Sequence, residues 1–193
     1  MDKLIYSQQF LDNTRKETLQ IIAEAEQILA SDLSKLNWKE NETRWSVLEV
    51  LMHLNSYAAY YFPEFEKANL KAKGTEPIES FKTTWFGRKC VTSVHPSTRV
   101  SKKMNAPKIH NHNSESTHQI SVVHEFLDHQ QTLLKILDVA KTVDLTKPKV
   151  RVQIAKLLKL NLGEFLMFMC THQRRHMDQA LEVLDDVTKL KMN

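Results

Sequence analysis

The chain has 193 residues, a length compatible with one domain and sufficient to bury a substantial core. Hydrophobic residues make up 41% and charged residues 26%, as in ordinary globular proteins, but three glycines and five prolines are few for the turns of a many-stranded fold. No apolar run approaches the ~20 residues of a membrane span, and the first residues lack the apolar core of a signal peptide. We therefore expect an all-α, soluble, cytoplasmic protein without a membrane partner.

The formal charge of +4 is unevenly distributed along the chain. Residues 67–108 contain ten Lys or Arg and two Glu, so the remainder is net acidic. Such a segment can meet an anionic substrate or a nucleic acid, or it can simply be solvated. It lacks regularly interleaved aromatic residues and a recognition-helix motif, so we do not expect nucleic-acid binding.

The first two helices are predicted from apolar spacing and from one start signal. Apolar residues at helical spacing predict a first helix over residues 4–30. Ser46 and Glu49 have the spacing of a capping box, so a second helix should begin there and continue to about Ala68. Pro63 should kink this helix or end it early.

The middle of the chain is predicted to be a long loop. The helical period disappears between residues 71 and 114, where glycines and prolines punctuate the sequence. Trp85, Phe86 and Val91 indicate some packing, so we expect this loop to lie over the helices.

Two more helices should follow the loop. Ser114 or Ser116 should cap a third helix, whose apolar seam extends to about residue 140. Residues 141–159 should form a basic connector with one short helix at 153–158. Asn161 and Glu164 form a second capping pair, which predicts the start of a fourth helix.

His172 and His176 lie four residues apart on this fourth helix, so their imidazoles share one face. Both occupy positions of the seam that otherwise hold core residues, and they could be core histidines satisfied by backbone or carboxylate partners. A shared metal ion would satisfy one nitrogen on each ring, whereas an unpaired buried polar group costs ~1 to 3 kcal/mol. His53, at the edge of the second helix's apolar face or within it, supplies a third imidazole.

A divalent ion bound by three neutral imidazoles keeps its positive charge and has coordination positions open for water or substrate. A divalent ion there would lower the pKa of a bound water or thiol, which suits attack on an electrophile, hydrolysis or thiol transfer. Imidazole ligands fit Zn, Ni, Cu or Fe, and we expect Zn or Ni first. The other six histidines are interpreted as mostly surface or loop residues: His95, His110, His112, His118, His124 and His129.

The same residues resemble a known family. The segment W-S-V-L-E-V-L-M-H-L at 45–54, followed over a hundred residues later by L-G-E-F at 162–165 and H-Q-R-R-H-M-D-Q at 172–179, resembles the DinB-like (DinB/YfiT) superfamily of metal-binding helical proteins. The resemblance implies one DinB-like four-helix-bundle domain over residues 1–193. A long crossover between helices two and three would make them parallel, in an up-down-down-up order.

The resemblance also implies a metal site of one histidine from the second helix and two from the fourth, here His53, His172 and His176. Characterised relatives include bacillithiol-dependent S-transferases and mycothiol-dependent isomerases, so a small-molecule substrate and a low-molecular-weight thiol are expected, and a homodimer is compatible with the family. Gln179 could orient a bound water or ligand, or it could be an ordinary polar edge residue, and Tyr57 could face the cavity or the core. Arg175 should form a salt bridge within the bundle.

Two functions are therefore open. The first is a metal-dependent transferase or hydrolase that activates a water or thiol against a small electrophile. The second is a non-catalytic bundle that is stabilised by the metal or binds a small molecule.

Overall fold

The computed structural model describes residues 4–71, 74–98, 107–113, 116–153 and 155–190. Within these ranges the chain consists mainly of α-helices, joined by short strands and 3-10 turns. The elements are, in chain order, β1 (Ile5–Tyr6), α1 (Ser7–Leu29), α2 (Leu33–Leu36), α3 (Val47–Lys71), β2 (Ser80–Phe81), α4 (Trp85–Val94), η1 (Pro96–Thr98), η2 (Lys108–His110), α5 (Ser121–Ala140), β3 (Lys149–Val152), β4 (Ala155–Asn161) and α6 (Leu162–Leu190).

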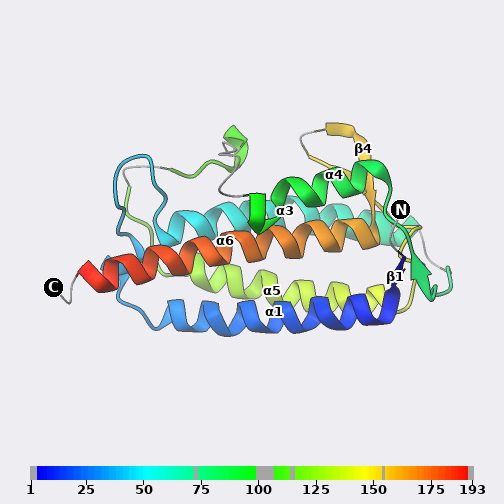
Figure 1. Ribbon diagram of the computed structural model, residues 1–193, viewed down its shortest axis with the longest axis horizontal. Coiled ribbons are helices and arrows are strands. Elements are labelled where there is room, and N and C mark those ends of the chain that lie inside the picture. The colour runs from blue at the N-terminus through cyan, green and yellow to red at the C-terminus, as the bar shows by residue number, and fades with distance from the viewer. Residues whose placement is uncertain (1–3, 72–73, 99–106, 114–115, 154, 191–193) are drawn as a thin grey trace.

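The four long helices α1, α3, α5 and α6 form a bundle (Figure 1). Helix α1 packs against α5 and α6, and α3 packs against the same two helices. In Figure 1, α1 and α6 run in one direction while α3 and α5 run in the other. The predicted all-α bundle with an up-down-down-up order is confirmed.

The apolar faces of these helices meet in two clusters along the bundle. One cluster lies where α1 ends and α3 begins, and the other lies where α3 ends and α6 begins. Members of the first cluster from all four helices are Ile21, Ala25, Ile28, Val50, Leu54, Phe126, Met177 and Ala180. Burying these side chains removes apolar surface from water, which is the main stabilising contribution to the bundle.

Both predicted capping boxes are present. The Ser46 backbone N–H donates to Glu49 Oε2 (2.9 Å), and the Glu49 N–H donates to Ser46 Oγ (3.2 Å). At α6 the Asn161 N–H donates to Glu164 Oε2 (3.0 Å), and the Glu164 N–H donates to Asn161 Oδ1 (2.8 Å). Each box satisfies backbone donors that the first helical turn leaves unpaired, so the start of each helix is fixed.

Helix α3 continues through Pro63 to Lys71, so the predicted early end at Pro63 is wrong. Pro63 lies on the exposed face, where it has no N–H to give to the carbonyl one turn earlier. Its neighbours Phe62 and Phe65 are 5% and 4% exposed. Their burial holds the helix together across the missing hydrogen bond.

The long crossover contains a helix, α4, where a loop was predicted. Thr84 caps it, because the hydroxyl oxygen of Thr84 accepts a hydrogen bond from the Gly87 N–H (3.0 Å). Gly87 lets α4 approach α6 closely, since a Cβ atom there would lie 2.2 Å from Cδ of Glu164. The Glu164 carboxylate also accepts a hydrogen bond from the Thr84 N–H (2.5 Å), so one side chain fixes the starts of both helices.

A β-hairpin of β3 and β4 replaces the short helix predicted at 153–158. The strands are antiparallel, with Val150 opposite Leu160. Lys149 and Arg151 are exposed while Val150 and Val152 are buried, the alternation of a half-buried strand. The hairpin covers the end of the bundle where α6 begins.

The remaining boundaries differ slightly from expectation. Helix α5 begins at Ser121 with Ile120 as its N-cap residue, so the predicted cap at Ser116 is wrong, and Ser114 lies outside the described residues. Residues Ile5–Tyr6 pair with Ser80–Phe81 as a two-stranded sheet instead of starting α1. Among the helices that the structure describes, none has the length and apolar character of a membrane span.

Candidate metal centre

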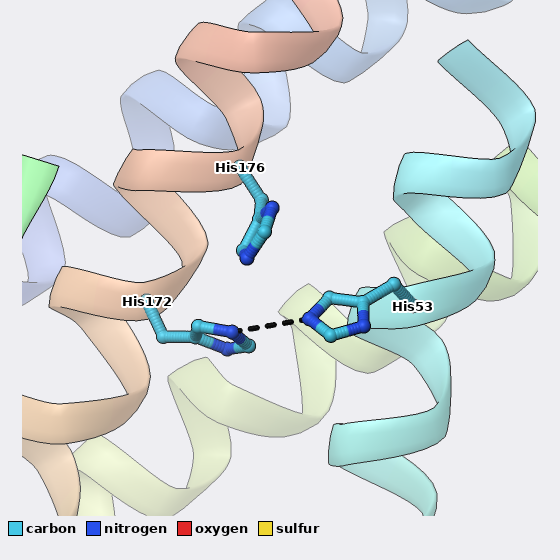
Figure 2. Close-up of side chains that lie close together, drawn as sticks. All are labelled: His53, His172 and His176. Carbon is cyan, nitrogen blue, oxygen red and sulfur yellow. Dashed lines mark hydrogen bonds between the residues drawn. The ribbon is translucent and has the colours of Figure 1, made fainter. Parts of the chain in front are cut away.

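The three histidines singled out from the sequence lie together between α3 and α6 (Figure 2). His53 comes from the second turn of α3, and His172 and His176 come from successive turns of α6. Their side chains point toward one another, and one ligating nitrogen from each ring lies within 4.8 Å of the other two. His53 and His172 are 2% and 4% exposed, while His176 is half-buried.

The orientation of the His53 ring is fixed by a main-chain carbonyl. Its Nδ1 lies 2.7 Å from the carbonyl oxygen of His110. Because a carbonyl only accepts, Nδ1 carries the hydrogen and Nε2 presents a lone pair. A partner of this kind on the non-ligating nitrogen is typical of metal-binding histidines.

His176 is held in a similar way by Gln179. The amide oxygen Oε1 of Gln179 accepts a hydrogen bond from Nδ1 of His176 (3.0 Å). Gln179 therefore orients a histidine of the cluster, a contact that the sequence did not predict. Its hydrogen bond leaves Nε2 of His176 as the nitrogen that presents a lone pair.

The spacing of the nitrogens suits a common ion. The Nε2 atoms of His53 and His172 are 3.2 Å apart. Two nitrogens at ~2.0 to 2.1 Å from a tetrahedral zinc ion would be separated by roughly 3.3 Å. Because His53 Nε2 cannot donate, this contact needs either a proton on His172 Nε2 or a cation shared by both lone pairs. The donor set therefore fits a divalent ion.

Burial keeps the two inner imidazoles neutral. Desolvation lowers the pKa of His53 to about 4, against the smaller opposing effect of its hydrogen bond to His110. Desolvation, followed by the proximity of His176 and His53, lowers the pKa of His172 well below its usual value. Only the neutral form of histidine can ligate a metal, so both rings are ready to do so near pH 7.

Aromatic side chains surround the cluster. Trp45 lies 4.9 Å from His53 between ring centroids, Tyr57 lies 4.4 Å from His172, and Phe168 stacks on His172 at 5.7 Å. Desolvation raises the pKa of Tyr57 to about 12, so its phenol remains protonated at neutral pH. Tyr57 thus faces the histidines, one of the two alternatives that the sequence left open.

Sequence reasoning missed His110. It was grouped with the surface and loop histidines, but it is 2% exposed and contacts both His53 and Tyr57. No spacing signal could have found it, since it acts on His53 through a main-chain carbonyl. Among the other five, His95 and His124 are exposed, His112, His118 and His129 are half-buried, and the ring of His129 hydrogen-bonds to Asn55 Oδ1 at 3.1 Å.

The neighbour of Arg175, Arg174, forms ion pairs within the bundle. The Arg174 guanidinium lies 2.8 Å from a carboxylate oxygen of Glu24 and 2.7 Å from one of Asp178. Arg175 donates a hydrogen bond to the carbonyl of His95 at 3.4 Å. Successive helical residues are turned by about 100°, and Arg174 is the one of the two whose guanidinium reaches Glu24 on α1.

The basic segment 67–108 is only partly described. Lys73, Arg99, Lys102 and Lys103 lie outside the described residues. Several of its other cations contact the protein itself: Lys67 pairs with Glu64 (2.8 Å), Lys89 lies over the ring of Trp85 (4.1 Å), and Arg88 donates to the carbonyl of Thr83 (2.8 Å).

Comparison with known proteins identifies the family. Curated proteins and solved structures gave no significant match. A model of the DinB superfamily matches residues 10–180, which include all four bundle helices in whole or in large part and the three clustered histidines. The up-down-down-up bundle is consistent with this match. The chain belongs to the DinB superfamily.

Proposed function

We propose that His53, His172 and His176 bind one divalent ion, Zn or Ni, and that the protein is an enzyme acting on a small electrophile. The nucleophile would be water or a low-molecular-weight thiol, as in an S-transferase. The observation that supports this most directly is the convergence of three imidazoles from two helices, with two Nε2 atoms 3.2 Å apart. Membership of the DinB superfamily agrees with a metal-dependent protein.

When bound, a divalent ion supplies Lewis acidity, which lowers the pKa of a water or thiol. The protein's own residues would prepare this chemistry. His110 and Gln179 orient two of the three imidazoles through their non-ligating nitrogens. Tyr57, Trp45 and Phe168 exclude water from the buried side of the cluster and strengthen electrostatic interactions there.

The number of histidines favours catalysis over a purely structural role. Structural zinc sites use four protein ligands, whereas catalytic sites use three and leave a position for water or substrate. His176 is half-buried, in contrast to His53 and His172, so the cluster is most accessible on its side. A non-catalytic bundle that is stabilised by metal or binds a small molecule remains the alternative that experiment must separate.

Thiol-transfer assays test the proposal. Metal-loaded protein would be incubated with a model electrophile and each of several low-molecular-weight thiols, beside His53→Ala and the control His124→Ala, which alters an exposed histidine on α5. We expect turnover by the native protein and the control, and background rates for His53→Ala. Background rates for the native protein with its metal bound would contradict thiol transfer.

A further inference from the structure

His110 is held by contacts of its ring with two other elements of the fold. Its ring nitrogens form hydrogen bonds with Oγ of Ser56 (2.8 Å, from Nδ1) and Oε1 of Gln153 (2.6 Å, from Nε2). Its ring also lies against Tyr57, with 4.0 Å between centroids. Ser56 and Tyr57 belong to α3, and Gln153 lies in the turn of the β3–β4 hairpin. The imidazole therefore joins three parts of the chain.

The short turn η2, which the His110 side chain anchors, contacts the His53 ring. The N–H of His110 donates to the carbonyl of Pro107 (2.8 Å), closing the short turn η2. The carbonyl of His110 accepts the hydrogen bond from Nδ1 of His53 (2.7 Å). Ser56 adds a second link, because its Oγ lies 2.7 Å from the carbonyl oxygen of His53 and 2.8 Å from Nδ1 of His110, and its one hydrogen can be donated to either of them.

We infer that His110 is a positioning residue for the proposed metal centre, and this inference rests on the proposed function. Its side chain locks η2 onto α3 and the hairpin, so that its carbonyl holds His53 with Nε2 directed at His172. The crossover and the hairpin thereby influence how tightly the site binds the ion, because they position its ligand His53 on α3.

The side chain matters because a carbonyl alone does not stay in place. A 3-10 turn of three residues has few internal hydrogen bonds to fix it. Ser56, Gln153 and Tyr57 supply the contacts that fix it from outside. Without them the His53 ring would rotate or exchange its proton between nitrogens, and Nε2 would present a lone pair only part of the time.

Zinc titration of the metal-free full chain tests this inference, using competition with a chromophoric chelator. His110→Ala removes the ring, and His110→Phe keeps a ring against Tyr57 while removing both hydrogen bonds. We expect both variants to raise the Kd for Zn²⁺ about 10- to 100-fold, the range for loss of an outer-shell partner. His124→Ala, on the exposed face of α5, should bind like the native protein. Native-like affinity in both His110 variants would overturn the inference.

The tautomer of His53 gives a readout that a general loss of stability would not change. In ¹⁵N NMR of the metal-free protein, we expect His53 to carry its hydrogen on Nδ1 in the native chain and to show mixed tautomers in both His110 variants. An unchanged tautomer in folded variants would overturn the inference. If the native protein binds no metal, the proposed function fails, but the tautomer experiment still decides whether His110 orients His53.

Discussion

The Nε2 atoms of His53 and His172 lie 3.2 Å apart although the residues are separated by 119 positions in the chain. His53 cannot donate from this atom, because its hydrogen is on Nδ1 against the carbonyl of His110. Either a hydrogen on His172 Nε2 or a cation can occupy the space between the two nitrogens, so metal binding requires the tautomer of His172 that carries its hydrogen on Nδ1.

The burial of neutral His53 predicts that the metal-free protein loses stability in mild acid. His53 titrates near 6.5 when unfolded and at about 4 when folded. Between these values the unfolded chain holds the proton, so the free energy of unfolding falls as the pH falls from about 6.5 toward 4. His53 alone should contribute on the order of 3 kcal/mol to this loss.

Denaturant unfolding at several pH values, with a chelator present, measures this effect. The variant His53→Gln should show a shallower decline, because the buried titrating ring is gone. The same decline in both proteins would show that other groups, and not His53, cause the acid sensitivity.

Gly87→Ala should destabilise the protein, although alanine normally stabilises a helix by roughly 0.5 to 1 kcal/mol relative to glycine. The new Cβ would lie 2.2 Å from Cδ of Glu164, the carboxyl group that holds the starts of α4 and α6. Overpacking of this kind costs roughly 1 to 3 kcal/mol. Thermal unfolding compared with Thr92→Ala, an exposed change in the same helix, isolates the clash. A higher midpoint for Gly87→Ala would disprove the close approach.

Removing the cap of α3 should weaken the bundle by about 1 kcal/mol. In Ser46→Ala the Glu49 N–H loses the hydroxyl oxygen that it donates to at 3.2 Å. Ser46→Thr keeps a hydroxyl and should retain most of the stability. Urea midpoints for the two variants measure the difference, and equal midpoints would mean that the capping box contributes nothing.

Arg174→Ala should destabilise by roughly 1 to 3 kcal/mol, because the mostly buried carboxylate of Glu24 loses its cation and, among the described residues, keeps only the Gln20 side-chain amide as a donor (3.0 Å). The side chains of Arg174 and Glu24 are 19% and 16% exposed. Arg44→Ala breaks the exposed pair with Glu40, where both side chains are more than half exposed, and should change stability by ~0 to 1 kcal/mol. Chemical denaturation of both variants would test the contrast, and similar losses would contradict it.

The parts of the fold that the sequence predicted carry strong local signals. Two capping boxes, each contained in four residues, predict helix starts: Ser46 with Glu49 and Asn161 with Glu164. Apolar residues at helical spacing follow each pair. His172 and His176 share a helical face by spacing alone. Local geometry therefore sufficed for most bundle-helix boundaries and for the pairing of His172 with His176. The place of His53 near the apolar face of the second helix suggested it as the third imidazole, and the family pattern supported that choice.

The parts that were missed depend on tertiary contacts or on weaker signals. Helix α4 was not predicted because Gly87 lies within it. Phe86, Cys90 and Val94 nevertheless repeat every four residues and pack on the core. Polar and apolar residues alternate from Lys149 to Val152, but four residues are too short a run to predict the strand β3. His110 has no such pattern, because what it gives to the site is a main-chain carbonyl placed by partners on other elements.

Metal content tests the central proposal most directly. Native protein and the His172→Ala variant would be purified without a nickel column, and elemental analysis would be combined with Zn²⁺ uptake by the folded, metal-free chains. We expect close to one divalent ion per native chain and a loss of that ion in His172→Ala. A fully folded native protein that contains no metal and takes up none would contradict the proposed metal centre.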